Sequence, residues 1–253
     1  MDLRAVDGFV QLHEPSIVIV ALDGQRRSEI DPMRSIYPAS MIKTPIAAAL
    51  AVDFDAGRCR PDDRKIVAAA NMTANDDVSP LVPGYSATLE ELAFRMITRS
   101  DNVATNELID VVERDRVNIA MRALGLDETH VRRKLSGSDP LIDDPQAAGR
   151  NTHPAGDAAR LFAAIATDAA PRSAWLRSLL EQQIWNTKIT RGLTDGDRFA
   201  HKTGDTSEVS HDGGILETSG GRRYVVVVYT TLASSSAADA AIAAYTHALR
   251  PLL

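Results

Sequence analysis

Strand-forming segments lie near both ends of the 253-residue chain, and this constrains the fold more than any other feature. Residues 16–22 (SIVIVAL) and 224–230 (YVVVVYT) are rich in β-branched and aromatic side chains, a composition typical of buried strands. The segment between them carries mainly helical patterns. We therefore expect an α/β (α+β) fold in which the N- and C-terminal segments form one antiparallel sheet with flanking helices.

The domain organisation follows from this layout. We expect a single domain over residues 1–253, with a sheet region at about 1–43 and 194–253. A central all-helical region is expected at about 44–193, without a convincing strand. Hydrophobic residues make up 44% of the chain and charged residues 25%, which is ordinary for a globular protein.

Composition excludes several function classes. The net charge of -6 and the lack of a basic run argue against nucleic acid as a partner. The single Cys59 rules out an internal disulfide, and the six histidines show no metal-ligand spacing, so no metal or cofactor is expected. No apolar run is long enough for a membrane span, and the N-terminus lacks a signal-peptide pattern. A monomer is expected, while the compartment stays open: cytoplasmic, or exported if the chain is a fragment.

A serine and a lysine three residues apart form the first chemical motif. Ser40 and Lys43 precede an alanine-rich helical run, and residues at i and i+3 of a helix share one face. A serine becomes a useful nucleophile when a neighbouring group accepts its proton. The chain holds five lysines against 23 arginines, yet Lys43 and Lys202 both fall in short motifs. An amine that can lose its proton is therefore indicated at these sites. Pro45 predicts a kink in this helix.

Two further motifs follow in order along the chain. Ser100-Asp101-Asn102 ends a strongly amphipathic segment, and Lys202-Thr203-Gly204 precedes a glycine-containing strand. Since the three motifs come from a helix, a turn and a strand, a cleft between the sheet and the helical region would bring them together.

In these three ordered motifs the chain resembles the penicillin-recognising serine enzymes, and within them the class A β-lactamases and the related D,D-peptidases. The resemblance covers nearly the whole chain. It implies a β-lactamase/transpeptidase-like fold and hydrolysis through an acyl-enzyme. The implied substrates are small molecules, either β-lactams or D-Ala-D-Ala-type peptides.

The resemblance also assigns roles to residues. Ser40 would attack the amide carbonyl, and Lys43 would accept its proton. Lys202 would lower the basicity of Lys43 and attract the substrate carboxylate. Ser100 would pass a proton to the departing nitrogen.

Substrate binding is implied for the neighbouring positions. Asn102 would orient Lys43 and the substrate amide, whereas Asp101 reads as a structural cap. Thr203 would bind the carboxylate beside Gly204. The backbone N–H groups of Ser40 and Asp205 would form the oxyanion hole. Arg191 and Lys188 are candidates for a further cation.

One departure from the family concerns deacylation. Class A lactamases carry a glutamate in the loop after the Ser-Asp-Asn turn, but residues 133–144 contain none. Asp139, Asp143 and Asp144 are the nearest carboxylates, and each side chain is one methylene shorter than glutamate. Four alternatives to an efficient lactamase therefore stay open: a slowly deacylating lactamase, a D,D-peptidase, an esterase-like hydrolase, and a penicillin-binding sensor that stays acylated. A serine glutaminase-type amidohydrolase also uses Ser-x-x-Lys, but the Lys202-Thr203-Gly204 element favours the lactamase side.

Overall fold

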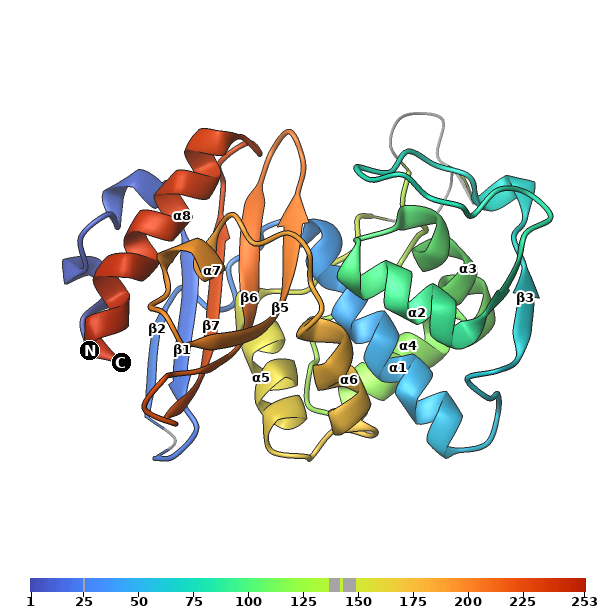
Figure 1. The fold of residues 1–253 in the computed structure, drawn as a ribbon, viewed down its shortest axis with the longest axis horizontal. Coiled ribbons are helices and arrows are strands. Elements are labelled where there is room, and N and C mark those ends of the chain that lie inside the picture. Colours follow the sequence, from blue (N-terminus) through green and yellow to red (C-terminus); the bar gives the residue numbers. More distant parts are fainter. Residues whose placement is uncertain (25, 137–141, 143–148) are drawn as a thin grey trace.

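The N- and C-terminal segments form one antiparallel sheet, as the sequence predicts. A computed structural model describes residues 1–24, 26–136, 142 and 149–253. The five strands run in the order β2-β1-β7-β6-β5, and β1 pairs with β7 so that Ile17 lies opposite Val228. The two termini lie close together beside the sheet (Figure 1). The strand bounds are β1 Ser16–Ala21, β2 Arg27–Ile30, β5 Arg198–Asp205, β6 Ser210–Glu217 and β7 Arg223–Thr230.

Both faces of this sheet are covered, which explains why the inner strands β1 and β7 are almost wholly apolar. Side chains of a strand alternate between faces. Ile17 and Val226 pack in one cluster with residues of α8 (Ser236–Leu249), whereas Val18 and Val227 pack in a second cluster with α5 (Ala155–Ala166). A strand with a hydrophobic layer on each side has no solvent face that would require polar residues.

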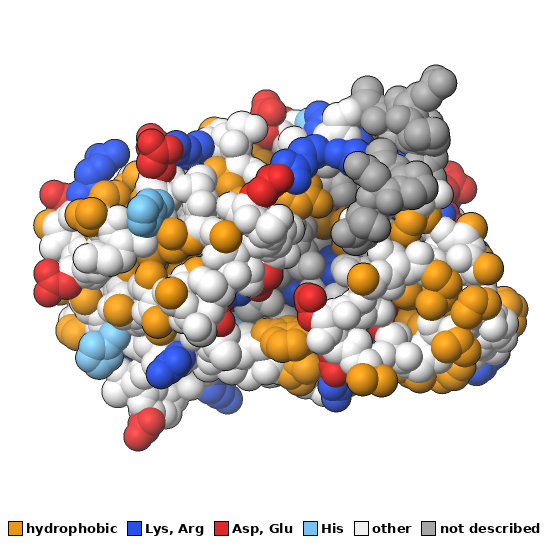
Figure 2. Space-filling view, turned by 90° about the horizontal axis from the view of Figure 1, so that it is seen from above, with side chains coloured by type: hydrophobic (Ala, Val, Ile, Leu, Met, Phe, Trp, Pro, Cys, Tyr) orange, Lys and Arg blue, Asp and Glu red, His pale blue; other side chains and the backbone are white. Residues whose placement is uncertain are grey.

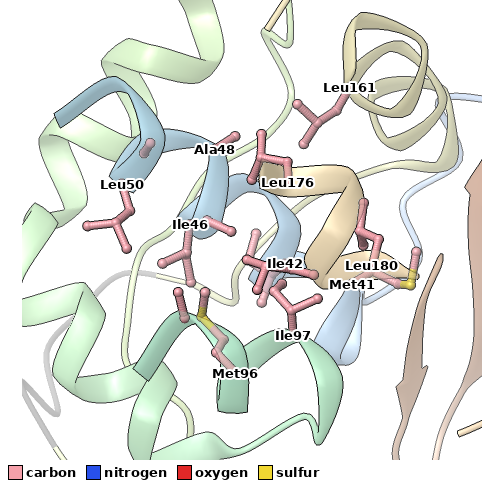
Figure 3. Packing of buried hydrophobic residues seen from close by; sticks show 14 of the residues in the cluster. Met41, Ile42, Ile46, Ala48, Leu50, Met96, Ile97, Leu161, Leu176 and Leu180 are labelled. Carbon is pink, nitrogen blue, oxygen red and sulfur yellow. The ribbon is translucent and has the colours of Figure 1, made fainter. Parts of the chain in front are cut away.

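The helical region is built around α1, the helix that follows the serine-lysine motif. α1 (Lys43–Asp55) contacts α2 (Leu89–Thr98), α3 (Asn102–Val112), α4 (Arg114–Ala123) and α6 (Ser173–Leu180). Figure 3 shows Ile46 and Leu50 of α1 among Met96 of α2 and Leu176 of α6. Because α1 is packed on several sides, the residues at its start are held in a fixed position.

The structure differs from the expectations in three local details. A short two-stranded sheet, β3 (Arg64–Ile66) with β4 (Ser86–Thr88), lies within the region expected to be all-helical; three residues are too few for a readable periodicity. The spacing of Leu3, Val6 and Val10 predicts a short N-terminal helix, but the structure has two 3₁₀ turns there, Leu3–Ala5 and Val10–Leu12. Pro45 is the third residue of α1, in the first turn, where its missing N–H costs no helical hydrogen bond, so the reason for expecting a kink is lost.

Membrane insertion through a helix has no support in the described part of the chain. None of its helices combines the length and the apolar character that a membrane span needs.

Candidate active site

Ser40 is held at the junction between the helical region and the sheet. It lies in a 3₁₀ turn, Ala39–Ile42, that runs directly into α1, and Ala39 adopts a left-handed backbone with φ 48°. Strand β5 passes close by: a Cβ on Gly204 would lie 2.9 Å from the carbonyl oxygen of Pro38. Glycine at position 204 thus allows β5 to approach the turn that presents Ser40.

The Ser100 turn is fixed by its neighbour Asp101. Ser100 has φ 57°, an uncommon backbone for a residue other than glycine. Asp101 caps α3, because its Oδ1 accepts a hydrogen bond from the N–H of Ala104 at 3.0 Å. Its Oδ2 accepts bonds from Ser79 and Arg95. The expectation that Asp101 acts as a structural cap is confirmed.

The amine of Lys43 is bound by the Ser100 turn. Lys43 Nζ donates to Ser100 O at 2.6 Å, to Ser100 Oγ at 3.0 Å and to Asn102 Oδ1 at 2.7 Å. Ser40 and Lys43 both belong to the described part of the chain, and no hydrogen bond joins Lys43 Nζ to Ser40 Oγ there. Burial, and after it the charge of Lys202, holds the pKa of Lys43 well below its ordinary value. Both effects favour the neutral amine that a general base requires.

The second lysine reaches the same hydroxyl from the sheet. Lys202 Nζ on β5 donates to Ser100 Oγ at 3.1 Å and to the Thr203 carbonyl at 2.9 Å. Burial lowers the pKa of Lys202 to about 7. Ser100 Oγ therefore lies between two amines, in a position to pass a proton between them and a bound substrate.

These motifs line a cleft of about 410 Å³ between the two parts of the molecule. Figure 2 shows a hollow near the middle of the upper face, where positive and negative side chains lie together. Ser40, Ser100, Thr203 and Asp205 all line the cleft. Asn102 is not among the lining residues and contacts the buried amine of Lys43. The Nδ2 group of Asn102 donates to the carbonyl of Ala74 at 2.7 Å. The remaining lining residues are Asp76, Trp185, Thr187, Lys188, Thr206, Ser207, Ser234 and Asp239.

Among the residues that the structure describes, the cation that lines this cleft is Lys188 rather than Arg191. Lys188 precedes the short helix α7 (Ile189–Gly192), and its side chain is 3% exposed. It forms a close ion pair with Oδ2 of Asp205 and lies 3.7 Å from Oδ1 of Asp239. Arg191 is exposed and is not among the residues that line the cleft.

Several supporting residues on β6 were not found by sequence reasoning. His211 donates through Nε2 to the carbonyl of Tyr37, three residues before Ser40, at 2.8 Å, and burial lowers its pKa to about 4. Asp212 accepts the N–H of Ile189 at 3.0 Å and so fixes the backbone beside Lys188. These contacts join segments far apart in the chain, and no local sequence pattern reveals them.

The deacylation candidates Asp139, Asp143 and Asp144 lie outside the described residues. The described part of the same segment is anchored to α3 by Asn106. Its Oδ1 accepts the N–H of Leu135 at 2.8 Å, and its Nδ2 donates to the Leu135 carbonyl at 2.9 Å. These two bonds hold the backbone of Leu135 against α3.

Comparison with known proteins identifies the family. The sequence model described as "Beta-lactamase enzyme family" matches residues 4–250, so the chain belongs to this family. A β-lactamase from Sphaerobacter thermophilus shares 30% identity at a TM-score of 0.85, covering 97% of this chain and 92% of that chain. PBP-A shares 26% identity at a TM-score of 0.83, over 94% and 89% of the two chains. A search of curated proteins found no significant match.

Among the similar structures is a point mutant of PBP-A, described as an acyl-enzyme complex with penicillin G. It shares 26% identity with this chain at a TM-score of 0.82, over 94% of this chain and 89% of that one. Family and fold together make this chain a serine β-lactamase-like hydrolase.

Proposed function

We propose that the protein opens the amide bond of β-lactams through an acyl-enzyme on Ser40 and releases the product slowly. The contact of one hydroxyl, Ser100 Oγ, with both Lys43 and Lys202 carries this proposal. Such a network supplies what acylation needs: a base for the nucleophile and an acid for the leaving nitrogen. The penicillin acyl-enzyme of the PBP-A mutant supports the substrate class.

The proposed acylation step uses Lys43 as the base, and substrate binding would have to bring its amine within hydrogen-bonding distance of Ser40. Ser40 Oγ forms a bond to the carbonyl carbon while its proton passes to the neutral amine of Lys43. The backbone N–H groups of Ser40 and Asp205 would donate hydrogen bonds to the carbonyl oxygen, where negative charge develops. Loss of one such donor typically costs about 100- to 1000-fold in rate. The C–N bond then breaks, and the nitrogen takes a proton from Ser100, which regains one from a neighbouring lysine.

Slow deacylation is proposed from the loop composition. Release of the acyl group needs a base that activates water, and residues 133–144 contain no glutamate. An aspartate reaches less far, and a misplacement of about 1 Å costs roughly 100-fold in rate. The acyl-enzyme should therefore accumulate.

A second candidate is a D,D-peptidase of the penicillin-binding type. The similarity to PBP-A over 94% of this chain favours it. In this case the acyl group comes from a peptide, and a β-lactam acts as an inhibitor that leaves the serine blocked.

One experiment separates these functions. The protein is mixed with a chromogenic cephalosporin or a fluorescent penicillin, and the intact mass and the rate of colour change are followed together. A long-lived adduct with little turnover supports slow deacylation, whereas rapid turnover contradicts it. D-Ala-D-Ala peptides assayed in parallel would show D-alanine release only for a D,D-peptidase. The Ser40→Ala variant should form no adduct.

A further inference from the structure

A buried histidine on β6 contacts the backbone that leads into the Ser40 turn. His211 lies opposite Gly204 in the sheet, and its Nε2 is 2.8 Å from the carbonyl oxygen of Tyr37. A carbonyl oxygen accepts hydrogen bonds and cannot donate them, so Nε2 carries the proton. This bond links the sheet directly to the segment that carries the nucleophile.

The other ring nitrogen has a partner that selects the same tautomer. The backbone N–H of Thr230 on β7 donates to His211 Nδ1 at 3.1 Å, so Nδ1 carries no proton. Burial lowers the pKa of His211 to about 4, and the ring is therefore neutral at neutral pH. Since both nitrogens are bound within the protein, His211 presents its N–H to Tyr37 and takes no part in proton transfer.

The ring of His211 is also fixed in orientation. It is fully buried and stacks on Tyr229, with the ring centroids 4.2 Å apart and an angle of 11° between the planes. Rotation of the ring would break both hydrogen bonds and the stacking contact. The position of the Nε2–H group is therefore set by β6 and β7, and the Ser40 turn adapts to it.

The bond to Tyr37 reaches the turn through two short steps. The Tyr37 carbonyl belongs to the peptide bond before Pro38, whose ring restricts its φ, here -74°. The Pro38 carbonyl then accepts the N–H of Met41 at 3.0 Å, which closes the turn around Ser40. Within this turn Ala39 has φ 48°, a conformation that costs free energy and persists where surrounding contacts hold it.

We propose that His211 is a positioning residue for acylation: its Nε2–H group, acting through the Tyr37 carbonyl, keeps the Ser40 turn in the conformation that aims Ser40 at the substrate carbonyl. This inference rests on the proposed function and adds a residue that touches neither the substrate nor the reacting atoms. The acylation rate should therefore depend on the donor at the Nε2 position more than on the rest of the ring.

Two substitutions separate the two ring nitrogens. His211→Gln places an amide N–H near the position of Nε2 and keeps a donor for Tyr37. His211→Asn places an amide oxygen near the position of Nδ1, which keeps an acceptor for Thr230, but its side chain is too short to reach Tyr37. Both variants lose the stacking contact, so denaturant unfolding should show similar losses of stability. His153→Asn is the matched control, because it truncates another buried histidine, one that contacts Thr129 at 2.8 Å.

The acylation rate is measured with benzylpenicillin by rapid quench and intact mass, under conditions in which unfolding curves show each variant to be folded. His211→Asn should lower the rate at saturating penicillin about 100-fold, whereas His211→Gln should stay within about fivefold of the native protein, because displacement of a reacting group by about 1 Å costs roughly 100-fold. The half-saturating concentration should change little. Equal loss in the two variants, native-like acylation by His211→Asn, or a similar loss in His153→Asn would overturn the inference.

A second measurement does not depend on acylation. Hydrogen exchange of the Met41 amide, which closes the turn, should be faster in His211→Asn than in His211→Gln and the native protein. Unchanged exchange in His211→Asn would also overturn the inference. A native protein that forms no adduct would instead contradict the proposed function, while hydrogen exchange would still show whether His211 holds the turn.

Discussion

The hydroxyl of Ser100 lies 3.0 Å from the amine of Lys43, although the two residues are 57 positions apart in the chain. Lys202 approaches the same hydroxyl from β5 at 3.1 Å. Two buried lysines that contact the same hydroxyl cannot easily both be in the charged ammonium form, because each charge disfavours the other. Burial lowers the pKa of both amines, and the charge of Lys202 lowers that of Lys43 further, so the site favours proton loss from Lys43.

Replacement of Ser100 by alanine removes the atom that joins the two amines. The rate of Ser40 acylation by a penicillin should fall by about 100-fold or more, the usual contribution of a positioned proton donor or acceptor. Stopped-flow measurement of the fluorescent adduct gives this rate. Ser178→Ala, a change of the same kind at an exposed position on α6, should acylate like the native protein. Equal rates for Ser100→Ala and the native protein would rule out the shared hydroxyl as a proton carrier.

Replacement of Gly204 by alanine tests the close approach of β5 to the Ser40 turn. The new Cβ would lie 2.9 Å from Pro38 O and 3.1 Å from Met41 Cγ. We expect a loss of about 1–3 kcal/mol in the free energy of unfolding, typical of overpacking. The displaced turn should also slow acylation about 100-fold. Denaturant unfolding and intact mass measure the two effects. Gly24→Ala is the matched control, because nothing lies within 4 Å of its Cβ position; comparable losses in both variants would contradict the steric account.

The charge of Lys202 should appear in the pH dependence of acylation. Its pKa of about 7 means that the positive charge is present below this pH and is lost above it. Acylation by benzylpenicillin should therefore decline as the pH rises through about 7. Its methyl ester has no carboxylate to attract and should show a weaker decline. Rates measured from pH 5 to 9 for both compounds test this, and identical alkaline limbs would show that Lys202 does not act on the carboxylate.

Burial of Lys202 should also appear in stability. The pKa is about 7 in the folded protein and 10.5 for a free lysine, so between these values the unfolded chain binds the additional proton. The free energy of unfolding contributed by this group therefore rises with pH across that window, by at most about 1.4 kcal/mol per unit. Lys202→Met lacks this contribution. Its stability relative to the native protein should be highest below pH 7 and decrease toward pH 10; a difference that does not change with pH would contradict the assignment.

The sequence predicts those features that short-range patterns encode. The apolar runs of β1 and β7 indicate buried strands, because both faces of the sheet are covered. The three motifs indicate the cleft, since their order and their helix, turn and strand contexts leave few arrangements. Strands β3 and β4 are not predicted, because a strand of three residues is too short to show an alternating pattern of polar and apolar residues.

Long-range contacts of the site could not be read from the sequence. The hydrogen bond from His211 to Tyr37 spans 174 positions, and the ion pair of Lys188 with Asp205 depends on how α7 meets β5. From the sequence alone, Lys188 and Arg191 are both candidates for a cation in the substrate site. Only the packing of the segment, fixed by Asp212, buries Lys188 at the cleft and leaves Arg191 exposed.

The central claim is that Ser40 forms an acyl-enzyme with a β-lactam and that this adduct persists. The most direct measurement is the intact mass of the protein after brief exposure to benzylpenicillin, followed over time and mapped by peptide digestion. We predict a mass increase equal to one penicillin, located on the peptide that contains Ser40, absent in Ser40→Ala and decaying slowly. No adduct in the native protein, or an adduct that survives in Ser40→Ala, would contradict the account.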